Sequence, residues 1–311
     1  MQTRTFAAMP PMERRQFVAA YRRFQAERDG TPDLARRSLS RREEFLAAIA
    51  AEPIHRAGPA VVTQQIYDEN AVQRAVAVDG LDEWALWTIC LSKCSRMEEY
   101  AVRYLADSGR LGAASAEDPY SLIDLEERYH GRLLASLLQI VGIQPGWRPP
   151  SFLTRLTLRA ILAVPRAVAN ITVLCGELIG LATFKLFLEK GRQLCADQPR
   201  AKARIELLLR EILIDEIGHV LFLRSQLGAI RLGLSWLLLP IIARVLISDY
   251  PEMQRLFGPR LRQEMLSPQL LQSVLDEVGG LPSLTSDLLA GVEPARPGSP
   301  AIAPQPRGQE P

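Results

Sequence analysis

Two distant segments of the chain repeat one pattern, an acidic residue followed by Glu-x-x-His. Residues 126–130 read Glu-Glu-Arg-Tyr-His, and residues 215–219 read Asp-Glu-Ile-Gly-His. Residues three apart on a helix share a face, so the glutamate and the histidine of each segment can bind the same metal ion. One such pattern is weak evidence. Two of them on separate helices are strong evidence for a metal site.

The rest of the chain has the periodicity of helices. Apolar residues recur every three or four positions, and no segment shows the sustained alternation of a strand. We predict an all-α fold in which Asp118-Pro119 and Pro199 begin helices, because proline is favoured in the first turn. The four longer helices are expected at residues 81–107, 118–141, 166–191 and 199–227.

Three further segments complete the predicted organisation. The arginine-rich residues 1–80 are expected to form an N-terminal helical extension, either as surface helices that cover the core or as a docking face for an acidic partner. Residues 228–290 are expected to form C-terminal helices that pack on a four-helix bundle of residues 81–227. The proline-rich residues 291–311 are expected to be a disordered tail.

Two more carboxylates are predicted to face the interior of this bundle. Glu98 falls on the apolar side of its helix, whereas its neighbour Glu99 falls on the polar side. Glu177 is the only charged residue in an apolar stretch of 18 residues. A carboxylate on a buried face needs a partner or a metal ion. Counting along antiparallel helices places Glu98 level with Glu127, and Glu177 close to the level of Glu216.

The order Glu, Glu-x-x-His, Glu, Glu-x-x-His resembles the ferritin-like di-iron carboxylate oxygenase superfamily, over about residues 81–225. The resemblance implies a ferritin-like four-helix bundle that binds two iron ions, with manganese or a mixed manganese–iron pair as alternatives. A set rich in carboxylates suits these metals better than structural zinc. Glu126 and Asp215 are expected to lie just outside the ligands and to orient the histidines. The implied ligands are Glu98, Glu127, His130, Glu177, Glu216 and His219.

The resemblance also implies an enzyme, a non-haem di-iron oxidoreductase of the monooxygenase or hydroxylase type. It would use dioxygen to hydroxylate, N-oxygenate or desaturate a small organic or acyl substrate. Electrons would come from an external ferredoxin or flavoprotein reductase, since the sequence contains no flavin, nicotinamide or iron–sulfur motif. The arylamine N-oxygenase branch adds a histidine one turn before the last glutamate, where this chain has Ile212.

Three alternatives stay open at this point. The first is a ferritin-like ferroxidase or peroxide-scavenging metal protein, and the second is a membrane-associated quinone-type hydroxylase. The third is a helical bundle that no longer binds metal and serves as a scaffold. Assembly into a large shell would favour the first, and failure to retain metal would favour the third.

Composition limits the expected partners and compartment. The 37 basic and 35 acidic residues give a formal charge of +2, which argues against a nucleic-acid-binding protein. Four cysteines are too few for a disulfide framework, and the first residues lack a secretory signal, so we expect a cytoplasmic protein. The preference for arginine over lysine is typical of a GC-rich bacterium. A homodimer is one expected assembly.

Two apolar segments raise the question of membrane contact. The segment between Arg231 and Arg244 is too short to span a bilayer. The longer stretch around Glu177 would place a bare carboxylate in lipid, which is expensive. We therefore expect both segments to be buried helices, and we keep interfacial membrane contact as a secondary hypothesis.

Several residues beside the motifs have more than one interpretation. The glycines at 176, 180 and 218 either leave space for oxygen or substrate or only permit close helix packing. Tyr129 is expected to pack in the core rather than to act in redox chemistry. His55, preceded by Glu-Pro-Ile, is expected in a surface loop.

Overall fold

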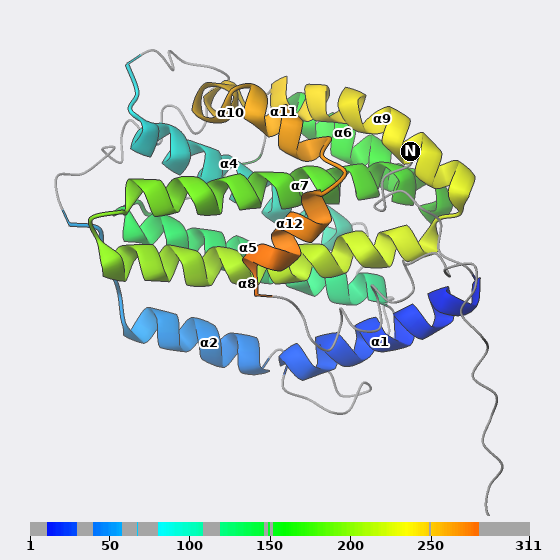
Figure 1. The fold of residues 1–311 in the computed structure, drawn as a ribbon, viewed down its shortest axis with the longest axis horizontal. Helices are drawn as coiled ribbons and strands as arrows, with labels where there is room; N and C mark the ends of the chain where they lie inside the picture. The colour runs from blue at the N-terminus through cyan, green and yellow to red at the C-terminus, as the bar shows by residue number, and fades with distance from the viewer. Residues whose placement is uncertain are drawn as a thin grey trace, which may run out of the picture.

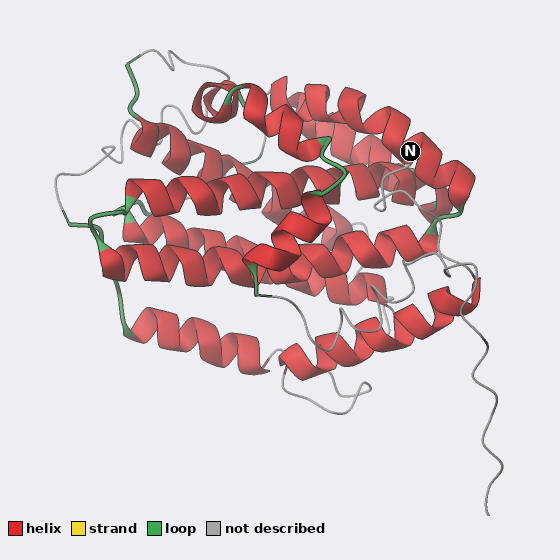
Figure 2. Cartoon of the chain, viewed as in Figure 1, coloured by secondary structure: helices red, strands yellow, loops and turns green. Residues whose placement is uncertain are grey.

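The computed structural model describes residues 11–29, 40–57, 67, 80–107, 119–145, 149, 152–248 and 250–279. Within these ranges the chain forms helices joined by loops and contains no strand, which confirms the all-α prediction for the described residues (Figure 2). The predicted tail at residues 291–311 lies outside the described residues, as does part of the predicted N-terminal extension.

Four long helices form the centre of the molecule (Figure 1). Helix α4 packs on α5 and α7, and α8 packs on the same two helices, so the four close into a bundle. Their bounds agree with the four predicted helices to within three residues. The four helices are α4 (Glu83–Asp107), α5 (Pro119–Ile140), α7 (Arg166–Leu194) and α8 (Pro199–Gln226).

Local sequence signals explain where these helices begin and end. Proline opens α5 and α8, because its fixed backbone angle suits the first turn and its missing N–H would have no partner there. Gly142 ends α5 with a φ of 79°, a left-handed conformation that favours glycine. The following N–H, of Ile143, donates to the carbonyl of Leu138 and closes the helix end.

The remaining helices surround the bundle. Helices α1 (Pro11–Asp29) and α2 (Ser40–Ala51) lie along the side formed by α8 and α5, and α9 (Ala229–Ser248) packs on α7. Helix α6 (Phe152–Ala163) precedes α7 and packs on it. Three short C-terminal helices contact α4, α7 and α8; they are α10 (Pro251–Phe257), α11 (Pro259–Met265) and α12 (Leu270–Glu277).

The core between the bundle helices consists of leucine, isoleucine and large aromatic side chains. Trp87 of α4 is fully buried, and its indole N–H donates to the carbonyl of Phe187 on α7 at 3.2 Å. Burial of such side chains is the main source of stability for a fold of this kind. The four cysteines are buried free thiols, in agreement with the absence of a disulfide framework.

One expectation about the C-terminal helices is wrong. Helices α7 and α9 are both long and apolar enough, by length and composition, to cross a membrane. In the most apolar part of α7, 67% of the residues are buried, but in α9 only 22% are. The segment around Trp236 is therefore not a buried helix, because α9 buries only the side that faces α7. When a helix is apolar on all sides, its sequence does not indicate which side packs against the rest of the protein and which side stays exposed.

Glycine to alanine changes at positions 218 and 176 are expected to have opposite effects on stability. A Cβ at Gly218 would lie 2.8 Å from the buried ring of Tyr21, so α1 would have to shift and Gly218→Ala should cost about 1–3 kcal/mol. A Cβ at Gly176 would meet nothing within 4 Å, and Gly176→Ala should stabilise its helix by about 0.5–1 kcal/mol. Urea unfolding measures both changes, and equal effects would contradict the described packing of α1.

Candidate metal centre

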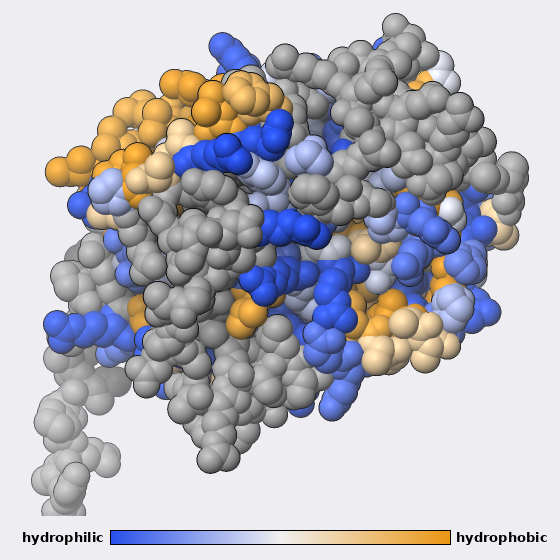
Figure 3. Space-filling view, turned by 180° about the vertical axis from the view of Figure 1, so that it is seen from behind, coloured by the Kyte–Doolittle hydropathy of each residue, from blue (hydrophilic) through white to orange (hydrophobic). Residues whose placement is uncertain are grey.

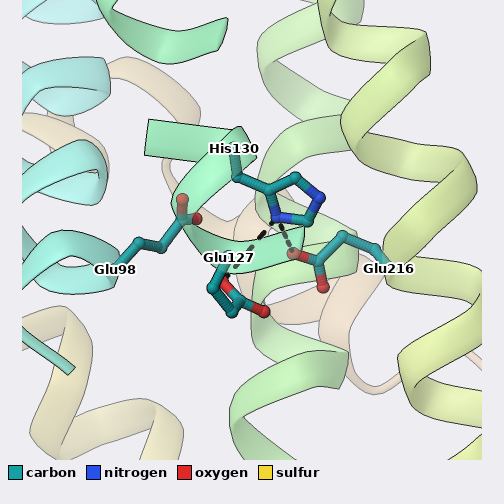
Figure 4. Close-up of side chains that lie close together, drawn as sticks. All are labelled: Glu98, Glu127, His130 and Glu216. Carbon is teal, nitrogen blue, oxygen red and sulfur yellow. Dashed lines mark ion pairs between the residues drawn. The ribbon is translucent and has the colours of Figure 1, made fainter. Parts of the chain in front are cut away.

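The six predicted ligands come together from the four bundle helices. They form two groups of four in which one ligand atom from each residue lies within 4.8 Å of the others. Glu127 and Glu216 belong to both groups, so the two groups are adjacent and have these two residues in common. The first group is Glu98, Glu127, His130 and Glu216, drawn in Figure 4, and the second is Glu127, Glu177, Glu216 and His219.

Helix α4 presents one of its two adjacent glutamates to this cluster. Glu98 belongs to the first group. The side chain of Glu99 is 36% exposed and accepts hydrogen bonds from Arg103 one turn later. The structure thus places the two residues as the apolar pattern of the helix predicts.

The two histidines turn the same ring atom toward the carboxylates. The Nδ1 of His130 lies 3.7 Å from Glu127 and 3.6 Å from Glu216. The Nδ1 of His219 lies 3.2 Å from Glu127 and 3.3 Å from Glu177. Both rings are fully buried, and their centroids are 5.7 Å apart. A metal ion in the first group would therefore be bound by Nδ1 of His130, and one in the second group by Nδ1 of His219.

The other ring atom of each histidine contacts a carboxylate from the opposite helix. The Nε2 of His130, on α5, lies 3.3 Å from Asp215 on α8. The Nε2 of His219, on α8, lies 3.0 Å from Glu126 on α5. A hydrogen bond from Nε2 to a carboxylate fixes the ring and leaves the Nδ1 lone pair for a metal ion. Both carboxylates were predicted to orient the histidines, but the crossed pairing was not predicted.

The N-terminal helices supply the counter-charges for these two carboxylates. Arg42 of α2 donates to Glu126 at 2.8 Å and to Asp215, and its side chain is 3% exposed. Arg28 of α1 lies 3.0 Å from Asp215, and Gln25 donates to Glu126 at 3.1 Å. Helices α1 and α2 cover the bundle, as one of the two expectations for the N-terminal extension had it. That Arg28 and Arg42 would turn inward to buried carboxylates was not predicted.

Charges at the centre are arranged in two layers. Burial raises the pKa of Glu98 and of Glu216 well above the usual range, and nearby carboxylates raise both further. In the outer layer, burial acts in the same direction on Asp215, but Arg28 and Arg42 outweigh it and hold its pKa well below the usual range. Among the described residues, Glu98 and Glu216 thus have no arginine or lysine partner, whereas Asp215 has two arginines. Glu127 differs from these two glutamates: burial raises its pKa, but hydrogen bonds from His130 and His219 outweigh burial and lower the pKa to about 2.

Three buried polar atoms of the first ligand group make no hydrogen bond to a described residue. Nδ1 of His130, Oε2 of Glu98 and Oε2 of Glu216 are buried and make no hydrogen bond within the described part of the chain. Such atoms are rare in folded proteins because each costs free energy. Divalent cations would satisfy these atoms and offset the repulsion between the carboxylates, so the residues present fit a pair of metal ions.

An apolar cavity of about 350 Å³ adjoins the cluster. Four of the predicted ligands, Glu98, Glu127, Glu177 and Glu216, form part of its wall. Gly176 also lines it and leaves open space there, whereas Gly218 permits close packing of α1. Much of the remaining wall is apolar, including Ile123, Val173, Phe184, Ile242, Leu246 and Met253.

Comparisons with protein-family models, curated proteins and solved structures find no match for this chain. The geometry of the site is therefore what indicates its chemistry. Two overlapping groups of carboxylates and imidazoles, held by a buried second layer of charge, open onto an apolar cavity.

Proposed function

We propose that the chain is a ferritin-like di-iron carboxylate oxidoreductase that uses dioxygen and external electrons to oxidise a small apolar substrate. The observation that carries this proposal is the pair of ligand groups that share Glu127 and Glu216. Carboxylates that belong to two groups at once are suited to bridge two metal ions. A cluster of four carboxylates and two imidazoles suits iron or manganese.

A reduced pair of iron ions supplies the activation of dioxygen. The chain's own residues would hold the ions, fix the histidines through Glu126 and Asp215, and shape access to the centre. The glutamates at 98 and 177 lie at the cavity wall, so a molecule in the cavity would lie directly beside the centre.

The cavity favours an oxygenase over an iron-storage protein. A ferroxidase needs a path for hydrated metal ions, and a wall rich in aliphatic side chains is poorly suited to one. The same wall suits the hydrocarbon or aromatic part of an organic substrate. Hydroxylation, N-oxygenation and desaturation are all compatible with a substrate held in this position.

The test of this function is metal content followed by oxygen reactivity. Protein expressed in iron-supplemented medium should contain about two iron ions per chain and should consume dioxygen after chemical reduction. Mass spectrometry of the metals and an oxygen electrode measure the two quantities. Absence of stoichiometric iron or manganese would refute the proposal, and a large shell that accumulates ferric mineral would replace it with storage.

A further inference from the structure

An exposed apolar surface lies over α6, the start of α7 and α9, and we call it the α6–α9 face. It is visible as the large hydrophobic area at the upper left of Figure 3. Ile230 is 84% exposed, Phe152 is 72% exposed, and Leu237 and Ile241 are each 60% exposed. The other exposed apolar residues of the face are Leu156, Val164, Val168, Leu234, Trp236 and Val245.

Helix α9 is apolar on both of its sides. Its outer stripe, at positions 230, 234, 237, 241 and 245, follows the three-and-four spacing of a single helix face. Its inner stripe, which includes Leu232, Leu239 and Ala243, is buried. A monomeric soluble protein rarely exposes a continuous apolar surface of this kind.

Hydrogen bonds hold α9 against the bundle. The hydroxyl of Ser235 donates to the carbonyl of Ile171 on α7 at 3.1 Å, and the thiol of Cys175 on α7 donates to the carbonyl of Ser235 at 3.2 Å. Ile242 and Leu246 of α9 also form part of the cavity wall. Helix α9 would have to leave this wall to cross a bilayer, so its outer side fits an interfacial position.

Charge on the face indicates what covers it. Helices α6 and α9 contain four arginines and no acidic residue. Arg159, Arg231 and Arg244 are exposed, and Arg155 is partly buried. A two-fold dimer through this face would bring these like charges together, because such an interface pairs a surface with itself. Exposed aliphatic side chains, a tryptophan and arginines without acidic residues match the surface of an anionic membrane.

We propose that the α6–α9 face docks on an anionic membrane surface without crossing it. Val164 is part of this face and also lines the cavity, so the cavity reaches the surface at the docking site. An apolar molecule dissolved in the membrane would then enter the cavity whose wall includes Glu98, Glu127, Glu177 and Glu216. This substrate class rests on the proposed oxidoreductase function, whereas the docking does not.

Flotation of the full-length protein with vesicles tests the docking. We expect the protein to float with vesicles of phosphatidylcholine and phosphatidylglycerol, and more weakly with phosphatidylcholine alone. Replacing Leu237 and Ile241 together by glutamine should weaken binding roughly tenfold or more. Arg231→Gln and Arg244→Gln should each weaken binding to the anionic vesicles about fivefold. Leu207→Gln, an exposed leucine on α8, is the matched control and should change nothing.

A fluorescence measurement covers the case in which the double variant does not fold. Trp236 is 53% exposed on the face, whereas Trp87 is fully buried. Brominated phosphatidylcholine in the anionic vesicles should quench the fluorescence of the wild-type protein, and the quenching should be much smaller in Trp236→Phe. No flotation and no quenching would refute docking, as would a dimer that the glutamine variant dissociates without any vesicle binding.

Metal analysis of the same samples separates the two proposals. Protein that contains iron but does not float would end the membrane proposal and leave the oxidoreductase proposal standing. Protein that floats but never retains metal would end the oxidoreductase proposal and leave membrane docking intact.

Discussion

Glu216→Ala should remove both metal ions, whereas His219→Ala should remove only one. Glu216 contributes an atom to both groups of ligands, and His219 contributes to one. We therefore expect iron to fall from about two ions per chain to well below one in Glu216→Ala, and to about one in His219→Ala. Glu127→Ala should behave as Glu216→Ala does, and His130→Ala as His219→Ala. Mass spectrometry of the metals measures the iron content of each variant, with every protein expressed in the same iron-supplemented medium.

Adjacent glutamates on α4 provide the control for this series. Glu98→Ala should lower the iron content, because Glu98 belongs to the first group. Glu99→Ala should leave it unchanged, because Glu99 is paired with Arg103 on the outside of the helix. Equal iron loss from the variants at Glu98, Glu216 and His219 would show that removing any one of these side chains abolishes both metal positions. Unchanged iron in Glu216→Ala would show that the metals bind elsewhere.

The cluster of carboxylates and histidines could be predicted from the sequence because its signals are local. Glutamate and histidine three apart share a helix face wherever that helix lies, and Glu177 stands alone in an apolar stretch. The four helix bounds were predictable for the same reason, since proline marks the starts of two helices and apolar periodicity marks their length. Bringing these faces together needs a bundle in which α4 packs on α5 and α7 packs on α8, with α6 in the connection between the two pairs.

The outer layer of the centre could not be predicted because it depends on contacts between distant segments. Arg42 is the second of two adjacent arginines on a short helix, and nothing local distinguishes it from its exposed neighbour Arg41. The crossed pairs of His130 with Asp215 and of His219 with Glu126 depend on how α5 and α8 face each other. Likewise, the exposed side of α9 depends on where α7 lies.

Arg42→Leu should be among the most destabilising single changes outside the core. The guanidinium group bridges Asp215 and Glu126, and all three side chains are buried. Its loss leaves two buried carboxylates short of positive charge, although Arg28 and Gln25 remain near them. Removing one partner of a buried ion pair costs about 3–5 kcal/mol, and we expect the lower end of this range. Urea unfolding of the metal-free protein measures the loss.

An exposed ion pair between α2 and α5 supplies the control for the buried one. Arg132 of α5 pairs with Glu43 of α2, and the two side chains are 52% and 54% exposed. Arg132→Leu should cost about 1 kcal/mol or less, because exposed ion pairs contribute little. If the two variants lose equal stability, then Arg42 only joins α2 to α5.

The iron affinity of Arg42→Leu shows whether Arg42 positions the two histidines or only stabilises the fold. Arg42 holds the two carboxylates that contact the Nε2 atoms of His130 and His219. Loss of such support lowers metal affinity by about 10–100-fold in characterised sites. Arg42→Leu should therefore weaken iron binding under conditions where the variant is still folded, and Arg132→Leu should not. A folded Arg42→Leu protein with normal iron affinity would show that the arginine stabilises the fold without positioning the histidines.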